Sequence, residues 1–326
     1  MKSTKCRIWL IVLFLVLFVI CEENTAASES MAEKASNGKY EVTFLEDRPN
    51  VEKGYSNDYV FRIRALAIAQ TSEFVLRDVG YPIEKMCLDA GFISGDRLLL
   101  LTRYAGRPDS QTVITIVSLP EAKSLDTIVC RAPALSPGKR FLIFEKGSLT
   151  HGPEKHQSTV VLAYDLELSP ADNRLPTAGD NPYATGVPVY PEAYAKAGLF
   201  YREEEQRPDN PFHHRVDSPF LWTEDASGVT FLCSHSKRTY LVQVDLRNGP
   251  RKAVICEQQV EITQDMIQPD RWLAFLSERD LGRDFVQIVC SKTIAWQDST
   301  HVVVAPTTAG TFFREEIVLP VPRCSE

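Results

Sequence analysis

The residues best suited to carry chemistry lie in a short segment with two imidazoles and a carboxylate, His151, Glu154 and His156. Side chains of these types bind transition metals. A catalytic zinc, however, needs three rigidly held protein ligands and one open position. Gly152 and Pro153 place the candidates around a hairpin tip, where no packed shell orients the imidazoles. We therefore predict a solvated loop and no metal site here.

Two further clusters combine charges of both signs. One runs from Arg202–Glu205 through Asp209 to His213 and His214, and the other joins Glu278–Asp280 to Arg283 and Asp284. The first could hold a cation or a partner. Charged loops that pair with themselves or with water are the simpler explanation of both clusters, and we expect such loops.

Local signatures of catalysis and cofactor binding are absent from the sequence. It contains no Gly-x-Ser-x-Gly elbow, no His-Glu-x-x-His, no P-loop and no Gly-x-Gly-x-x-Gly, so we expect no cofactor. A site assembled from several repeats leaves no local motif. A hydrolase or lyase therefore stays open as the alternative function, and a pocket that joined two or more of the following residues would favour it: Asp225, Asp270, Asp298 and His301.

The elements that must position these residues follow one repeated plan. A tight turn opened by Asp, Gly, Lys or Ser precedes an apolar run, and a loop, a second apolar run and another turn follow. The runs are rich in β-branched and aromatic residues, which is typical of strands. Copies begin at Gly95, Ser136, Asp225 and Pro269, and a partial copy runs from Gln297 to Leu319.

The spacing of the copies indicates the architecture. Gly95 and Gly138 are 43 residues apart, as are Cys87 and Cys130. A period of about 40–45 residues built from short strands is that of one four-stranded propeller blade. The run Leu98–Leu101 shows no polar alternation, which favours a strand buried on both faces between two neighbouring blades.

One turn carries a resemblance to a known family. Ser136–Arg140 reads Ser-Pro-Gly-Lys-Arg. It resembles the TolB-like and WD40-like propeller repeats of secreted and periplasmic bacterial proteins, whose hallmark is a Ser-Pro-Asp-Gly-Lys turn before an apolar strand. The Asp is missing here, and Asp225–Gly228 and Pro269–Arg271 match less well. The resemblance covers roughly residues 87–320 and implies a fold rather than a function.

The predicted fold is therefore all-β, a β-propeller of about six four-stranded blades, with a multi-sheet β-sandwich as the alternative. Residues 40–86 and 170–221 fit the plan less cleanly, and each is expected to form an irregular blade. Trp222, Trp272 and Trp296 stand near repeated strand starts, so we expect them to pack between blades rather than to bind a sugar.

The N-terminus predicts export. A positive start with Lys2, Lys5 and Arg7 leads into the apolar run Ile8–Ile20. This run is too short to span a bilayer core of about 30 Å comfortably, and it suits the core of a signal helix. Small residues at Thr25–Ala27 then predict cleavage after Ala27. The expected organisation is a signal peptide or membrane anchor over 1–27, a flexible linker over 28–39 and a β-propeller-like domain over 40–326.

Two alternatives to cleavage stay open, namely an uncleaved anchor and lipidation at Cys21. Leu17–Cys21 loosely resembles a bacterial lipoprotein signal, although Ile20 stands where Gly, Ala or Ser is required. Either alternative would attach the domain to a membrane through the N-terminal segment alone. Otherwise we expect a periplasmic or extracellular protein.

Cysteines and net charge complete the expectations. Six cysteines follow the leader, widely spread and without a CxxC pair, so disulfides are permitted but their pairing is open. Removing the leader takes the net charge from −7 to −8, which disfavours a nucleic-acid partner. We therefore expect a non-enzymatic module that binds a protein or a small molecule through its loops.

Overall fold

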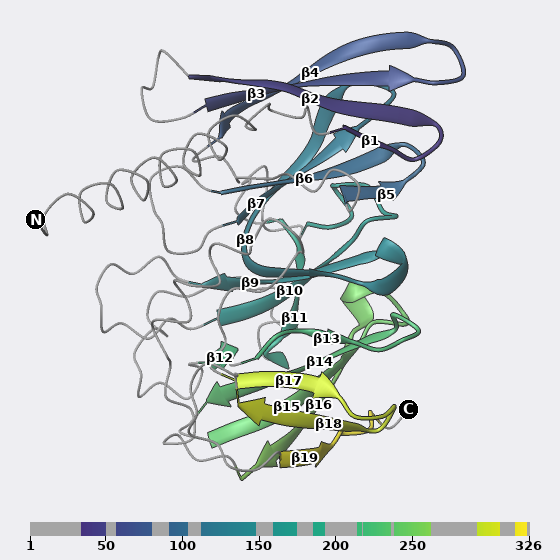
Figure 1. The fold of residues 1–326 in the computed structure, drawn as a ribbon. Coiled ribbons are helices and arrows are strands. Elements are labelled where there is room, and N and C mark those ends of the chain that lie inside the picture. The colour runs from purple at the N-terminus through teal and green to yellow at the C-terminus, as the bar shows by residue number, and fades with distance from the viewer. Residues whose placement is uncertain are drawn as a thin grey trace, which may run out of the picture.

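The computed structural model is all-β, as the sequence predicts. It describes residues 34–49, 57–79, 91–103, 112–147, 159–174, 185–192, 214–216, 218–235, 238–261, 292–306 and 317–324. Within these ranges, antiparallel sheets follow one another in chain order, from the purple strands to the yellow ones (Figure 1).

The first sheet is a four-stranded meander in the order β1-β2-β3-β4. Residues 40–86 were expected to form an irregular blade, and the strand register does shift within the described part of this stretch, between Phe44 and Glu46 and between Asn57 and Tyr59. The sheet also starts earlier than expected, because its first strand lies inside the stretch assigned to a linker. The strands are β1 (Lys34–Ser36), β2 (Tyr40–Pro49), β3 (Asn57–Ala65) and β4 (Gln70–Val79).

The second and third sheets share the strand β8 (Lys123–Leu135). Its first part, Lys123–Cys130, pairs with β7, and Arg131–Leu135 pairs with β9. The register shifts between Arg131 and Ala134, where Ala132 has φ 45°. Hydrogen bonding thus continues through seven strands in the order β11-β10-β9-β8-β7-β6-β5. The sheet is not flat, because its two halves enclose one apolar core.

Four of the remaining strands of these two sheets, β6, β7, β9 and β10, lie at apolar runs of the repeated plan, whereas β5 and β11 were not predicted. The second sheet contains β5 (Phe92–Ser94), β6 (Arg97–Arg103) and β7 (Thr112–Ser118), and the third contains β9 (Phe141–Gly147), β10 (Thr159–Asp165) and β11 (Val187–Tyr190). A short 3-10 turn, Pro137–Lys139, leads into β9 at the predicted Ser-Pro-Gly-Lys turn.

The fourth and fifth sheets complete the described fold. In the fourth, β12 and β13 both pair with β14, and β15 and β16 follow. The third strand of the fifth sheet ends near the C-terminus. The strands are β12 (His214–Val216), β13 (Leu221–Trp222), β14 (Gly228–His235), β15 (Arg238–Asp245), β16 (Val254–Val260), β17 (Lys292–Trp296), β18 (His301–Pro306) and β19 (Ile317–Pro320), with a 3-10 turn at Pro250–Lys252.

Successive sheets pack face to face. The evidence is that neighbouring residues of one strand enter different cores. Leu98 and Leu100 of β6 lie in the core shared with the first sheet, whereas Leu99 lies in the core shared with the third. On β9, Phe144 faces the second sheet and Phe141 faces the fourth. This arrangement explains the unbroken apolar runs, and each four-stranded meander packed between two others has the form of a propeller blade.

The two faces of the first sheet differ. One face packs on the second sheet, and the other exposes charged and polar side chains, although Val60 on this second face is buried. The exposed residues of this second face include Lys34, Arg62, Arg64, Thr71 and Glu73.

The described part of the chain contains no apolar helix of the length that is needed to span a bilayer.

At one end of the stack, short turns connect strands that pair within the same sheet, and we call this end the turn end. It comprises the turns 37–39, 66–69, 95–96, 119–122, 137–140, 224–227 and 297–300. Several side chains there reach the next sheet. The contacts are Lys39 Nζ to Asp96 Oδ1 at 2.5 Å, Lys139 Nζ to the Phe92 carbonyl at 2.8 Å and Trp296 Nε1 to the Trp222 carbonyl at 2.8 Å.

Candidate functional site

Toward the opposite end, five polar and aromatic side chains converge between the third and fourth sheets. We call them the ring cluster: Tyr190, His214, His235, Tyr240 and Glu257. Tyr190 and His214 are buried, with 1% and 7% exposure. The side chain of Glu257 is 42% exposed, so it is the member of the cluster that solvent reaches most readily.

Strand pairing positions this cluster. His214 of β12 and His235 of β14 are direct cross-strand partners. Tyr240 of β15 is opposite Cys233, two residues from His235 and on the same face. Glu257 of β16 is opposite Val242, whose side chain also enters the core shared with the third sheet. Tyr190 completes the cluster from the last strand of the third sheet.

The rings form a stack. The His235 ring lies parallel to the Tyr240 ring, with centroids 4.0 Å apart. The His214 ring lies 4.5 Å from the His235 ring, with the two planes tilted by 37°. Tyr190 meets His214 edge-on at 5.5 Å. Its hydroxyl donates a hydrogen bond to Glu257 Oε2 at 3.1 Å.

The electrostatics of the cluster keep Glu257 ionised. Contact with the His235 imidazole and the hydrogen bond from Tyr190 hold the pKa of Glu257 below its usual value, against the effect of burial. Burial raises the pKa of Tyr190 far above its usual range, and nearby Cys233 and Glu257 raise it further. Tyr190 is therefore a hydrogen-bond donor and not a base.

This geometry favours binding over proton transfer. Glu257 Oε2 is 3.8 Å from His235 Nε2, beyond hydrogen-bond distance, so the pair is not aligned as an acid–base dyad. Nε2 is buried and makes no hydrogen bond to any described residue. A carboxylate beside aromatic rings is instead a recognition element for a cationic group.

Most residues that the sequence singled out lie outside the described part of the chain. This holds for His151, Glu154 and His156, so the prediction that they form no metal site stays a prediction. It also holds for the cluster around Glu278 and Arg283. Of the cluster that begins at Arg202, only His214 is described, and it belongs to the ring cluster. Among the described residues no group of three His, Cys, Asp or Glu side chains could hold a metal ion.

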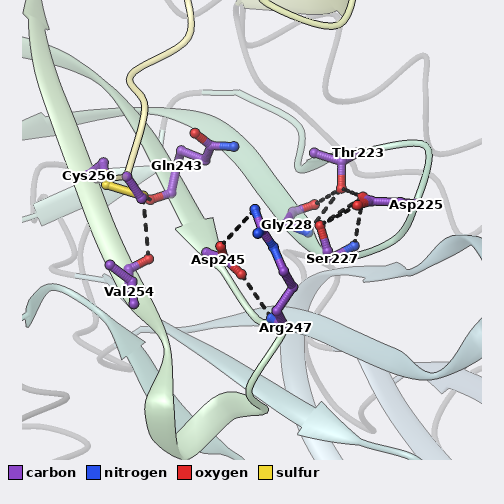
Figure 2. Close-up of polar contacts among 10 residues, drawn as sticks. Thr223, Asp225, Ser227, Gly228, Gln243, Asp245, Arg247, Val254 and Cys256 are labelled. Carbon is purple, nitrogen blue, oxygen red and sulfur yellow. Dashed lines mark hydrogen bonds and ion pairs between the residues drawn. A yellow bond between two sulfur atoms is a disulfide. The ribbon is translucent and has the colours of Figure 1, made fainter. Parts of the chain in front are cut away.

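The acids of the alternative enzyme hypothesis lie in separate turns. Asp225 hydrogen-bonds within its own turn to Thr223 and Ser227 (Figure 2). Asp298 accepts bonds from Thr300 and lies 3.1 Å from His301 Nδ1, both side chains being about half exposed. Asp270 lies outside the described residues. Asp298 and His301 thus meet on an exposed turn, which is not the pocket that the hypothesis requires.

These turns predict a pH dependence. Hydrogen bonds from Thr223 and Ser227 lower the pKa of Asp225 from 3.8 to about 2. Because the folded-state pKa is depressed, the stabilisation is fully present above pH 3.8 and is lost as the pH falls through about 2. We expect Asp225→Asn to lower the unfolding midpoint at neutral pH and to have progressively less effect below pH 3.8. Thermal melts across this range measure it.

The equivalent turn of the fifth sheet provides a repeat of the same experiment. Backbone and side-chain hydrogen bonds from Thr300 lower the pKa of Asp298 to about 2 as well, so Asp298→Asn should show the same convergence with wild type in acid. A gap from wild type that stays constant across the range would show that ionisation of these turns does not stabilise the fold.

The described cysteines resolve part of the open pairing. Cys256 of β16 forms a disulfide with Cys324, which ties the C-terminal segment to the fourth sheet next to Val254 and Gln243 (Figure 2). Cys130 and Cys233 are buried and form no disulfide, as expected for thiols that pack as small apolar side chains.

The tryptophan prediction is confirmed for the two described residues. Trp222 stacks on Phe141 of the third sheet, with ring centroids 6.4 Å apart and planes 10° apart. The Trp296 indole donates to the Trp222 carbonyl. Trp272 lies outside the described residues.

The chain resembles solved structures but matches no known family. No family model and no curated protein matches the chain. Solved structures that resemble it include an oligopeptidase B from Leishmania major (10% identity, 88% of this chain and 32% of that chain, TM-score 0.37) and one reported in an analysis of two prolyl endopeptidases (9%, 83% and 32%, 0.35). Another is the β-propeller domain of the Trilobed protease from Pyrococcus furiosus (10% identity, 88% of this chain and 66% of that chain, TM-score 0.33).

The chain thus spans about a third of the length of the two peptidase structures. At these TM-scores the likeness carries no argument, and the fold assignment rests on strand order and core packing alone.

Proposed function

We propose that this chain is an exported, non-enzymatic propeller module of the TolB-like kind, and that it binds a cationic group of a partner at the ring cluster. The observation that carries the proposal is the Glu257 carboxylate. It is kept ionised, it is 42% exposed, and it stands beside stacked His and Tyr rings.

The overall charge supports the same class of ligand. The chain after its leader is acidic, with a net charge of −8, which attracts basic partners and repels anionic ones. The guanidinium of arginine suits a site of this type, because it pairs with carboxylates and also stacks on rings.

The compartment is part of the proposal. The leader predicts export, and the Cys256–Cys324 disulfide is typical of proteins that mature in an oxidising compartment. Periplasmic or extracellular location follows if the leader is cleaved after Ala27. Membrane attachment follows if it is retained or if Cys21 is lipidated.

A titration with N-acetyl-arginine amide, followed by NMR, tests the binding site. We expect the ring protons of His235 and Tyr240 to shift with this probe and not with the uncharged N-acetyl-norleucine amide. Glu257→Gln should abolish the shifts, because it removes the charge and keeps the shape. Glu121→Gln, at the turn end, serves as the matched control and should leave them unchanged. Shifts that persist in Glu257→Gln, or no shifts in wild type, would refute the site.

A further inference from the structure

The turn between β3 and β4 is an exposed apolar tip, and we define the apolar tip as Leu66–Ala69. All four residues are exposed, with Leu66 at 38% and Ile68 at 68%. Turns normally use Gly, Pro, Asn, Asp or Ser. A run of four exposed apolar residues is a fault in a soluble protein unless it has a function.

The second sheet supplies an internal comparison. Its turn Leu119–Ala122 has the same length between paired strand ends, and it ends on Ala122 with φ 48°, where the apolar tip ends on Ala69 with φ 50°. In the second sheet the third position is Glu121, which is ion-paired to Lys123. The backbone of this turn therefore does not require the isoleucine at position 68.

The first position of the two turns supports the same conclusion. Leu119 is buried, with 1% exposure, and belongs to the core between the first two sheets. Leu66 occupies the matching position but stays exposed, and its backbone N–H is fixed by the Lys39 carbonyl at 3.0 Å. The apolar tip is thus an ordered feature that presents two aliphatic side chains to the outside.

We propose that the apolar tip inserts into the surface of a lipid bilayer. Its side chains are purely aliphatic and carry no hydrogen-bonding group, whereas protein-binding hot spots favour Trp, Tyr and Arg. Hydrocarbon accepts such a tip without shape complementarity. Lys39 and Arg64 are exposed behind it, at the place where basic side chains meet lipid headgroups.

Two further facts fit this occupant. The cation of Lys39 is paired with Asp96, so binding should need no anionic lipid and gain only modestly from it. The first strand, β1, begins at Lys34, and residues 21–33 separate it from the apolar run of the leader. This segment, fully extended, reaches about 45 Å, so a retained leader would hold the first sheet close to a membrane.

Flotation with vesicles of phosphatidylcholine, with and without phosphatidylglycerol, tests the proposal on the chain cleaved after Ala27, because a retained leader would hold every variant to the vesicles. We expect wild type to bind both. Replacing Leu66 and Ile68 together by serine should weaken binding on the order of a hundredfold. Ile68→Glu should do likewise without unfolding the chain, because the matching turn already holds Glu121. Leu168→Ser, which changes another exposed leucine (41%), is the control and should bind as wild type.

Each other outcome overturns the inference. These are no binding by wild type, equal binding by the tip variants, or equal loss in Leu168→Ser. Capture of a protein through the apolar tip without vesicle binding also overturns it. Glu257→Gln lies toward the other end of the sheets and should not change vesicle binding, so a failure here leaves the proposed function standing.

Discussion

Asp126→Ala is expected to destabilise the fold by about 3–5 kcal/mol, the range for breaking a buried ion pair. The Asp126 side chain is 2% exposed and lies 2.8 Å from Arg174 Nη2. It also accepts a hydrogen bond from the buried Tyr164 hydroxyl at 3.1 Å. Tyr164 belongs to the third sheet and Asp126 to the second, so the substitution leaves a charge and a hydroxyl unpaired across this interface. Urea unfolding at neutral pH measures the loss.

An exposed ion pair between sheets serves as the control for this prediction. Asp96 contacts Lys39 across the first and second sheets, but both side chains are at least half exposed. Asp96→Ala should therefore cost less than about 1 kcal/mol. Equal losses from the two variants would show that burial between the sheets does not strengthen the Asp126 interaction.

Loss of the Cys256–Cys324 disulfide should destabilise the chain by about 4 kcal/mol. The two cysteines are 68 residues apart in the sequence, and the chain-entropy model assigns a cross-link of this loop size a stabilisation of about 4 kcal/mol. We expect the Cys256→Ser/Cys324→Ser variant to unfold at correspondingly lower urea concentration than the oxidised wild type.

Reduction provides the control within the same measurement. Dithiothreitol should destabilise wild type at least as far as the double substitution does. Of the other described cysteines, Cys130 and Cys233 form no disulfide, so a further effect of the reductant on the variant would indicate a bond of Cys87 or Cys290, which lie outside the described residues. No destabilisation of wild type by the reductant would contradict the pairing.

Local patterns were enough to predict the long apolar strands of the repeated plan. The run Leu98–Leu101 lacks alternation because its residues enter cores on both sides, and the 43-residue offset is real because Gly95 and Gly138 both lie in turns before the second strand of a sheet. These features depend on side-chain type and on turn residues, and both can be read from a few neighbouring positions in the sequence.

Features that depend on strand pairing were not predictable in this way. Lys34–Ser36 carries no strand signal of its own and forms β1 only by pairing with β2. The bend in β8 uses Ala132 with φ 45°, where a Gly or Asn would have given a signal. No local pattern signals that β8 continues beyond Cys130 into the next sheet.

The ring cluster was missed for the same reason. His214 was noted only as part of a charged stretch, and His235, Tyr240 and Glu257 belong to three different strands. Cross-strand register brings them together, and Tyr190 comes from another sheet. The nearest signal in the sequence is the spacing of Cys233 and His235, which puts an imidazole on the apolar face of a strand.

The central claim is that successive sheets stack so that neighbouring residues of one strand face different sheets. Methyl NOE spectroscopy of leucine-labelled protein tests it most directly. The account predicts contacts from the Leu98 and Leu100 methyls to aromatic rings of the first sheet, Phe61 and Phe74, and from Leu99 to Phe144 of the third sheet. Contacts from Leu99 and Leu100 to one and the same sheet would contradict it.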